Sequence, residues 1–281
     1  MISVLQLGTI DYATAFRLQE KVVALRKEDR IGDVLLLLEH TPVITLGRNA
    51  KSAHVVASPE FLAQRGVEVF ECDRGGDVTF HGPGQLVAYP IFDLRGFPSS
   101  LANRNSMGVV EFVRNLEEVL IRTCAKLGIP AKRIEGLTGI WTDNPSLSSR
   151  AEQDDLLANR LEKSRGLLRE AKIAALGIHI SRGVTSHGIA LNVNTDLSFF
   201  DLIIPCGITS KPVTSMQQEL GREIPMQDVA HALSRNFSQV FQSQMLWLDS
   251  LDALLGTNLG IPMKVPENLH RIHKDDDTAW S

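Results

Sequence analysis

Short apolar runs alternate along the chain with polar segments that contain glycine and proline, a pattern typical of buried strands joined by turns. The run from Val34 to Leu38 is too short for a typical helix and predicts a buried strand. Pro42 follows and separates this strand from the next. Similar runs predict strands at residues 4–7, 43–46, 67–70, 86–94 and 139–142.

Other stretches carry apolar residues at helical spacing. Asp11 is placed to cap a helix, with one face marked by Tyr12, Phe16, Gln19 and Val23. Residues 105–127 form a second predicted helix, which Gly128 and Pro130 bring to an end. The last long helix is expected at about residues 226–241, after a helical turn at 196–200.

The second half of the chain adds a hairpin. Residues 172–180 and 184–193 read as strands, and Ser181-Arg182-Gly183 between them is a hairpin signal. Strands and helices therefore follow each other irregularly, with hairpins in the second half. This order predicts an α+β protein in which a mixed β-sheet is packed against helices.

Two segments stand apart from this core, which we place at about residues 1–245 of a single domain spanning 1–281. Residues 144–170 are polar and predict an inserted loop followed by a charged helix. We expect this insertion to be a surface excursion, with a lid or docking role as the alternative. The tail at about 264–281 is polar as well, and we expect it to be weakly ordered.

Composition narrows the classes of function. The chain has 281 residues and a net charge of −4, so no overall positive field favours nucleic acid or anionic membranes. The cysteines Cys72, Cys124 and Cys206 do not form a disulfide pattern, which indicates a reducing compartment. The sequence shows neither a signal peptide nor an apolar run of membrane-spanning length. We therefore expect a cytoplasmic protein.

The most informative stretch begins at Arg74 and ends at Leu94. Arg74 and His81 stand at the two ends of a Gly-Gly loop, and Gly82-Pro83-Gly84 imposes a fixed turn before the apolar run. Glycines let backbone N–H groups approach a ligand closely. The stretch therefore predicts a strand that leaves a pocket wall made largely of backbone.

The full string starting at Arg74 reads Arg-Gly-Gly-x-x-Thr-x-His-Gly-Pro-Gly-Gln-x-x-x-Tyr-Pro-Ile. It resembles the signature of lipoyl(octanoyl) transferases. Further matches to this family's pattern are His-Gly-x-Ala-Leu-Asn at 187–192, Pro-Cys-Gly-Ile at 205–208 and Val-Thr-Ser at 213–215. The resemblance covers residues 34 to about 220 apart from the insertion, where the family usually has a short hairpin.

This resemblance implies a biotin/lipoate protein ligase-like fold and an acyltransferase. Such an enzyme moves an octanoyl group from octanoyl-acyl carrier protein to a lysine of a lipoyl domain, the first step of endogenous lipoate cofactor synthesis. Its acceptors would be the lipoyl domains of 2-oxoacid dehydrogenase complexes and the glycine cleavage H protein. The resemblance implies no cofactor and no metal, and no His-Glu-x-x-His spacing occurs.

The resemblance also assigns the catalytic pair, Cys206 and Lys172. Cys206 lies between Pro205 and Gly207, and a thiol attacks a thioester only as the thiolate. A neighbouring ammonium stabilises that anion. By residue type alone, the better interpretation is a buried structural thiol for Cys206 and a surface lysine at a strand end for Lys172. Cys124 reads as core filler and Cys72 as structural.

The family's substrate-contact segments fall on three stretches of this chain. These residues are Arg74, Gly75, Gly76, Asp77, Val78, Thr79, Phe80 and His81, then Ala175, Leu176 and Gly177, and finally Gly188, Ile189 and Ala190. The small residues suit a narrow apolar slot for an acyl chain. We expect acidic carrier and lipoyl domains to dock on a basic rim, for which Arg48, Lys51 and Arg74 are candidates.

Three alternatives stay open. An ATP-dependent lipoate or biotin protein ligase would share a lysine like Lys172, but it needs no nucleophilic thiol, and the chain has no Walker-type phosphate loop. A non-enzymatic acyl-carrier adaptor would need neither Lys172 nor Cys206. A thiol hydrolase would use both residues and replace the acceptor amine by water.

Overall fold

The structure is a computed structural model that describes residues 1–101, 104–144, 169–204 and 211–255. The predicted inserted helix, the polar tail and Cys206 lie outside these residues. The expectations for these segments therefore stay predictions. In the part of the chain that the structure describes, no helix is both long and apolar enough to cross a membrane.

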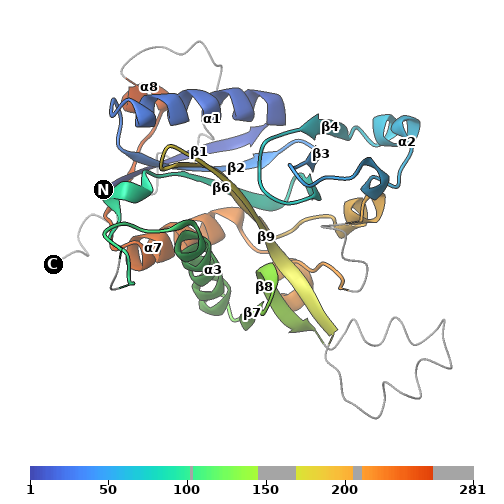
Figure 1. Cartoon of the computed structure of the whole chain (residues 1–281). Helices are drawn as coiled ribbons and strands as arrows, with labels where there is room; N and C mark the ends of the chain where they lie inside the picture. Colours follow the sequence, from blue (N-terminus) through green and yellow to red (C-terminus); the bar gives the residue numbers. More distant parts are fainter. Residues whose placement is uncertain (102–103, 145–168, 205–210, 256–281) are drawn as a thin grey trace.

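An eight-stranded sheet forms the centre of the molecule, in the order β11-β1-β2-β6-β10-β9-β8-β7 (Figure 1). Its strands are β1 (Ile2–Ile10), β2 (Asp33–His40), β6 (Gln85–Ile91), β7 (Ala131–Ile134), β8 (Leu137–Asn144), β9 (Arg169–Ser181), β10 (Val184–Asn192) and β11 (Met245–Trp247). β1 runs parallel to β2 and β11, whereas the other neighbours pair antiparallel. The predicted mixed sheet is therefore confirmed.

Helices cover both faces of this sheet. α1 (Tyr12–Lys27) lies on one face, whereas α3 (Val109–Lys126) and α7 (Met226–Val240) lie on the other (Figure 1). The apolar run in β2 follows from this arrangement. Leu36 belongs to the core cluster under α1, while Leu35 and Leu37 belong to the cluster under α3 and α7. A strand with helices on both faces needs apolar residues at successive positions.

The predicted N-cap at Asp11 matches the structure, whereas the second predicted helix begins four residues later than expected. The Asp11 side chain accepts a hydrogen bond from the backbone N–H of Thr14 at 2.8 Å, as expected of an N-cap. The helix predicted from residue 105 begins at Val109.

The described residues also form short helices, which are α2 (Pro59–Gln64), α6 (Met216–Leu220), α8 (Leu251–Leu255), η1 (Ser52–His54), η2 (Leu94–Gly96) and η4 (Leu197–Leu202).

A second, three-stranded sheet lies beside the first, in the order β4-β3-β5. It consists of β3 (Val43–Leu46), β4 (Glu68–Glu71) and β5 (Val78–His81). The Gly-Gly loop predicted over 74–81 is thus shorter than expected, because its last four residues form β5. The remaining loop reaches the large sheet, where the backbone N–H of Gly75 donates to the carbonyl oxygen of Ile178 at 3.1 Å.

Candidate functional site

A narrow pocket, called the slot below, lies where the loop from Arg74 crosses β9 and β10. The residues that line it are Tyr12, Arg74, Gly76, Thr79, His81, Val87, Tyr89, Ala175, Leu176, Gly177, His187, Gly188, Ile189 and Ala190. All three segments predicted to contact substrate contribute to this lining. The second and third segments meet because β9 pairs with β10. The first segment lies about a hundred residues earlier in the sequence, and the bond from Gly75 to Ile178 brings it to β9.

Small residues make room for the slot. Ala175 pairs with Ala190, and Gly177 pairs with Gly188, across β9 and β10. A Cβ atom added at Gly177 would lie 2.7 Å from the carbonyl oxygen of Gly75, so the loop packs directly against this strand. A Cβ added at Gly188 would lie only 2.1 Å from the carbonyl oxygen of Ala88. Side chains at these positions would displace backbone on both sides.

Four of the predicted contact residues do not line the slot. Gly75 joins the loop to Ile178 through its backbone. The Asp77 carboxylate lies 2.5 Å from Nδ1 of His54 and accepts a hydrogen bond from the backbone N–H of Val78. Val78 and Phe80 are buried in the core of the small sheet. These residues hold the loop in place, and nothing in their geometry brings their side chains to the slot.

Arg74 is buried, which corrects its assignment to an exposed basic rim. Its Nη2 donates to the carbonyl oxygen of Thr45 at 2.6 Å, and its Nε donates to the Thr45 hydroxyl at 3.0 Å. Its Nη1 donates to the carbonyl oxygen of Gly75 at 3.1 Å. The guanidinium therefore fastens the loop to β3, where a lysine could not make the same fork of bonds.

Buried polar side chains lie in and directly behind the slot lining beside Arg74: His81 and Tyr89 line the slot, and His40 contacts Tyr89. The ring nitrogen Nδ1 of His40 lies 3.1 Å from the Ile10 carbonyl, so it carries the proton, and Nε2 accepts from the Tyr89 hydroxyl at 2.7 Å. Burial lowers the pKa of His40 to about 4. Burial, followed by the charges of His40 and Arg74, lowers the pKa of His81 well below its ordinary value. Both imidazoles are therefore neutral at pH 7.

Lys172 lies on β9, three residues before Ala175. Its Nζ atom sits 4.7 Å from the centre of the Trp141 ring. Its backbone N–H donates to the carbonyl oxygen of Pro212, and its own carbonyl accepts from Thr214, both at 2.9 Å. The segment that follows residues 205–210 is therefore fixed directly to Lys172. On the other side of those residues, the backbone N–H of Ile204 donates to the His54 carbonyl at 2.7 Å.

The pairing of Lys172 with Cys206 stays a prediction, because Cys206 lies outside the described residues. Of the other cysteines, Cys124 is buried in the main core, which confirms it as core filler, and burial raises the pKa of its thiol to about 12. Cys72 is half-buried, with its sulfur 3.5 Å from the Leu46 carbonyl oxygen. Among the described residues, no cluster of histidine, cysteine or carboxylate side chains is arranged to hold a metal ion.

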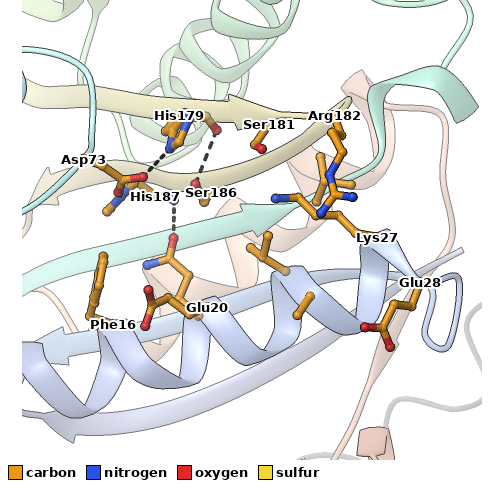
Figure 2. A pocket seen from close by; sticks show the side chains of 14 residues that line it. Phe16, Glu20, Lys27, Glu28, Asp73, His179, Ser181, Arg182, Ser186 and His187 are labelled. Atoms are coloured by element: carbon orange, nitrogen blue, oxygen red, sulfur yellow. Dashed lines mark hydrogen bonds and ion pairs between the residues drawn. The ribbon is translucent and has the colours of Figure 1, made fainter.

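A second and wider pocket, called the outer pocket below, has a volume of about 380 Å³. It lies between α1 and the ends of β9 and β10 near their hairpin (Figure 2). Asp73 accepts hydrogen bonds from His179 and from Nε2 of His187, the latter at 2.7 Å. Nε2 of His179 lies 3.0 Å from a guanidinium nitrogen of Arg48.

Sequence reasoning missed several residues of this site. His40 received no role, and Tyr12 was assigned only to a helix face. The pattern at 187–192 was matched to the family, yet His187 itself was not singled out. Tyr89 was present in the matched string without a function. Their contribution depends on which strands become neighbours, and a single sequence does not specify that.

The sequence of this chain is similar to those of known proteins over most of its length. The family model "Lipoyl protein ligase A/B catalytic domain" matches residues 11–238. An octanoyltransferase from Koribacter versatilis is 56% identical over 276 residues, which cover 98% of each chain. An octanoyltransferase from Acidobacterium capsulatum is 51% identical over 257 residues, covering 91% of this chain and 96% of the relative.

Solved structures share the fold at much lower sequence identity. A bipartite lipoate protein ligase from Thermoplasma acidophilum superposes with a TM-score of 0.61 and 16% identity, covering 91% of this chain and 90% of the other. Lipoate-protein ligase A bound with ATP gives the same TM-score and identity, with 89% of each chain covered. The predicted ligase-like fold is thereby confirmed.

Proposed function

The chain belongs to the lipoyl protein ligase A/B catalytic domain family, and we propose that it is an octanoyltransferase that works through a cysteine thioester. The donor is octanoyl-acyl carrier protein, and the acceptor is a lysine side chain of a lipoyl domain. The octanoyltransferases from Koribacter versatilis and Acidobacterium capsulatum, which match this chain over most of its length, support the reaction. One observation supports an acyl-binding site: all three motif segments line a single slot, and part of its wall is β9, the strand that contains Lys172.

The first half-reaction transfers the acyl group to the enzyme. The thiolate of Cys206 attacks the thioester carbonyl, a new carbon–sulfur bond forms, and the bond to the carrier's sulfur breaks. The carrier then leaves as a thiol after it takes up a proton. The ammonium of Lys172 favours the attacking thiolate and is a suitable proton donor for the leaving sulfur.

The second half-reaction transfers the acyl group to the acceptor. The neutral amine of the acceptor attacks the Cys206 thioester, an amide bond forms, and the bond from the acyl carbon to the Cys206 sulfur breaks. The thiolate of Cys206 is regenerated, and the proton that the amine nitrogen loses returns Lys172 to its ammonium form. Each half-reaction passes through a tetrahedral oxyanion, which backbone N–H groups stabilise in acyl transfer. Burial of the octanoyl chain between Ala175, Gly177 and Gly188 contributes roughly 0.8 kcal/mol per methylene group.

The acceptors we propose are the lipoyl domains of 2-oxoacid dehydrogenase complexes and the glycine cleavage H protein. With Arg74 buried, the basic rim for acidic partners reduces to Arg48 and Lys51. Arg48 is exposed and contacts His179, which lines the outer pocket. Lys51 is exposed, and its backbone N–H donates to the Asp77 carboxylate at 3.3 Å.

Intact-protein mass spectrometry tests this proposal. The purified chain is incubated with octanoyl-acyl carrier protein in the absence of ATP, and we expect a gain of one octanoyl group. The adduct should be lost in Cys206→Ala and retained in the matched control Cys72→Ala. On addition of a lipoyl domain, the group should move to that domain. Acylation that requires free octanoate and ATP would instead establish a ligase.

A further inference from the structure

The slot and the outer pocket meet at a single side chain. Among the described residues, only His187 lines both spaces. Its side chain is 3% exposed, although the outer pocket beside it has a volume of about 380 Å³. The imidazole of His187 is therefore the partition between a narrow space and a wide one.

Several contacts fix this partition in place. Nε2 of His187 donates to Asp73 at 2.7 Å, and Asp73 is held in turn by His179. The backbone N–H of His187 donates to the side-chain oxygen of Gln19 on α1 (Figure 2). The ring also packs against Phe16, with 5.9 Å between ring centres. The residue has a φ angle of 57°, which non-glycine residues rarely adopt, so the backbone holds the ring in an unusual direction.

The ring presents a neutral surface. Since the Asp73 carboxylate accepts from Nε2, the other nitrogen, Nδ1, is unprotonated, and it is buried with no hydrogen-bond partner among the described residues. Burial lowers the pKa of His187 despite the neighbouring carboxylate of Asp73. A neutral ring flanked by Phe16 and Tyr89 is compatible with an apolar group placed against it.

The order of residues along β9 gives the slot a direction. Lys172 comes first, Ala175 and Gly177 line the slot, and His179 follows at the end that binds Asp73. His187 on β10 pairs with Ile178, next to that end. An acyl chain whose thioester carbon lies near Lys172 therefore points its terminal methyl group toward His187.

We propose that His187 is the end wall of the slot and sets the acyl chain length that the enzyme accepts. The proposal rests on the acyl transfer proposed above, and it adds the residue that determines specificity. Beyond the ring, Val23, Ala24 and Val184 provide apolar surface in the outer pocket. Removal of the imidazole joins the two spaces, and a longer chain then extends into the outer pocket.

The test is the variant His187→Gly, because glycine accepts the positive φ angle without strain. The measurement is kcat/KM for acylation of the enzyme by octanoyl-, decanoyl- and dodecanoyl-acyl carrier protein. Each methylene group that gains an apolar site is worth roughly fourfold in kcat/KM. We expect the decanoyl-to-octanoyl ratio to rise on the order of tenfold in the variant, and the dodecanoyl ratio to rise further.

Two further variants test whether a change in the chain-length ratio comes from joining the slot to the outer pocket. Ser186→Ala alters the outer pocket but not the slot, and it should leave the wild-type chain-length ratio unchanged. Ala24→Phe, introduced together with His187→Gly, fills the outer pocket from α1 and should restore the preference for octanoyl. If His187→Gly does not fold, as judged by circular dichroism, His187→Asn takes its place, because asparagine tolerates this φ angle.

The two proposals fail in different ways. If the wild-type chain forms no octanoyl adduct, the proposed function is wrong. If the wild type is acylated but a folded His187 variant keeps the wild-type ratio of decanoyl to octanoyl, His187 is not the end wall. An equal loss of activity toward all chain lengths would give His187 a general structural role and would also overturn the inference.

Discussion

Gly188 offers a sharp test of the packing that forms the slot. A methyl group at this position would lie 2.1 Å from the carbonyl oxygen of Ala88 on β6, where ordinary contact begins at 3.4 Å. β6 and β10 would have to separate by about 1.3 Å, although they are paired from Gln85 to Ala88. Overpacking of this kind costs about 1–3 kcal/mol in a well-packed core.

The matched control is Gly96→Ala, because Gly96 is exposed and a Cβ atom there meets nothing within 4 Å. Replacement of a glycine at a compatible site stabilises a protein by about 0.4–1 kcal/mol, since the unfolded chain loses freedom. The two changes are chemically identical, yet the structure predicts opposite signs for the change in the free energy of unfolding.

The assay is thermal and urea unfolding of both variants. We expect Gly188→Ala to lower Tm by several degrees, at roughly 2–4 °C per kcal/mol, while Gly96→Ala raises it slightly. Because Gly188 also lines the slot, its variant should show a lower kcat/KM with octanoyl-acyl carrier protein. Equal Tm values for the two variants would refute the close approach of β6 to Gly188.

Two other predictions concern charge. Lys172→Met should slow acylation at pH 7 and shift the pH profile of kcat/KM upward, because the thiol of Cys206 loses the ammonium that favours its anion; an unshifted profile would remove Lys172 from this role. For His40, the folded pKa of about 4 lies below the ordinary value of 6.5, so the unfolded chain binds more protons between these values. Its contribution to stability is complete above pH 6.5 and falls by about 3 kcal/mol as the pH drops to 4. Urea unfolding at several pH values should show this fall and a smaller one in His40→Gln, and identical pH dependence in both proteins would contradict the assignment.

Much of the fold could be predicted because local pattern and burial agree. β2 and α1 are examples, since the apolar run from 34 to 38 and the cap at Asp11 both match the structure. The small sheet was predicted only in part. β3 and β4 match the strands expected at 43–46 and 67–70, whereas β5 was taken as part of the Gly-Gly loop because its four residues lie between glycines. Tertiary pairing rather than propensity decides such short strands.

The candidate site was likewise predicted only in part from the sequence. The motif residues that line the slot could be found because their spacing is fixed within each segment, as in Ala175 to Gly177. Burial of Arg74 could not be predicted, since arginine is mostly exposed and its partner Thr45 lies on a strand of unknown neighbours. The partition by His187 depends on an unusual φ angle and on Asp73, a residue more than a hundred positions away.

The flanks of residues 205–210 are tied to different parts of the molecule. Ile204 is bonded to His54, beside the small sheet, whereas Pro212 and Thr214 are bonded to Lys172 on the large sheet. The described residues on either side of that span, Ile204 and Pro212, are therefore held by different sheets. The loop from Arg74 also joins the two sheets, through its bonds to Ile178 on β9 and to Thr45 on β3. The distance between Ile204 and Pro212 thus depends on how the small sheet is placed against the large one, and a ligand that shifts this placement changes that distance.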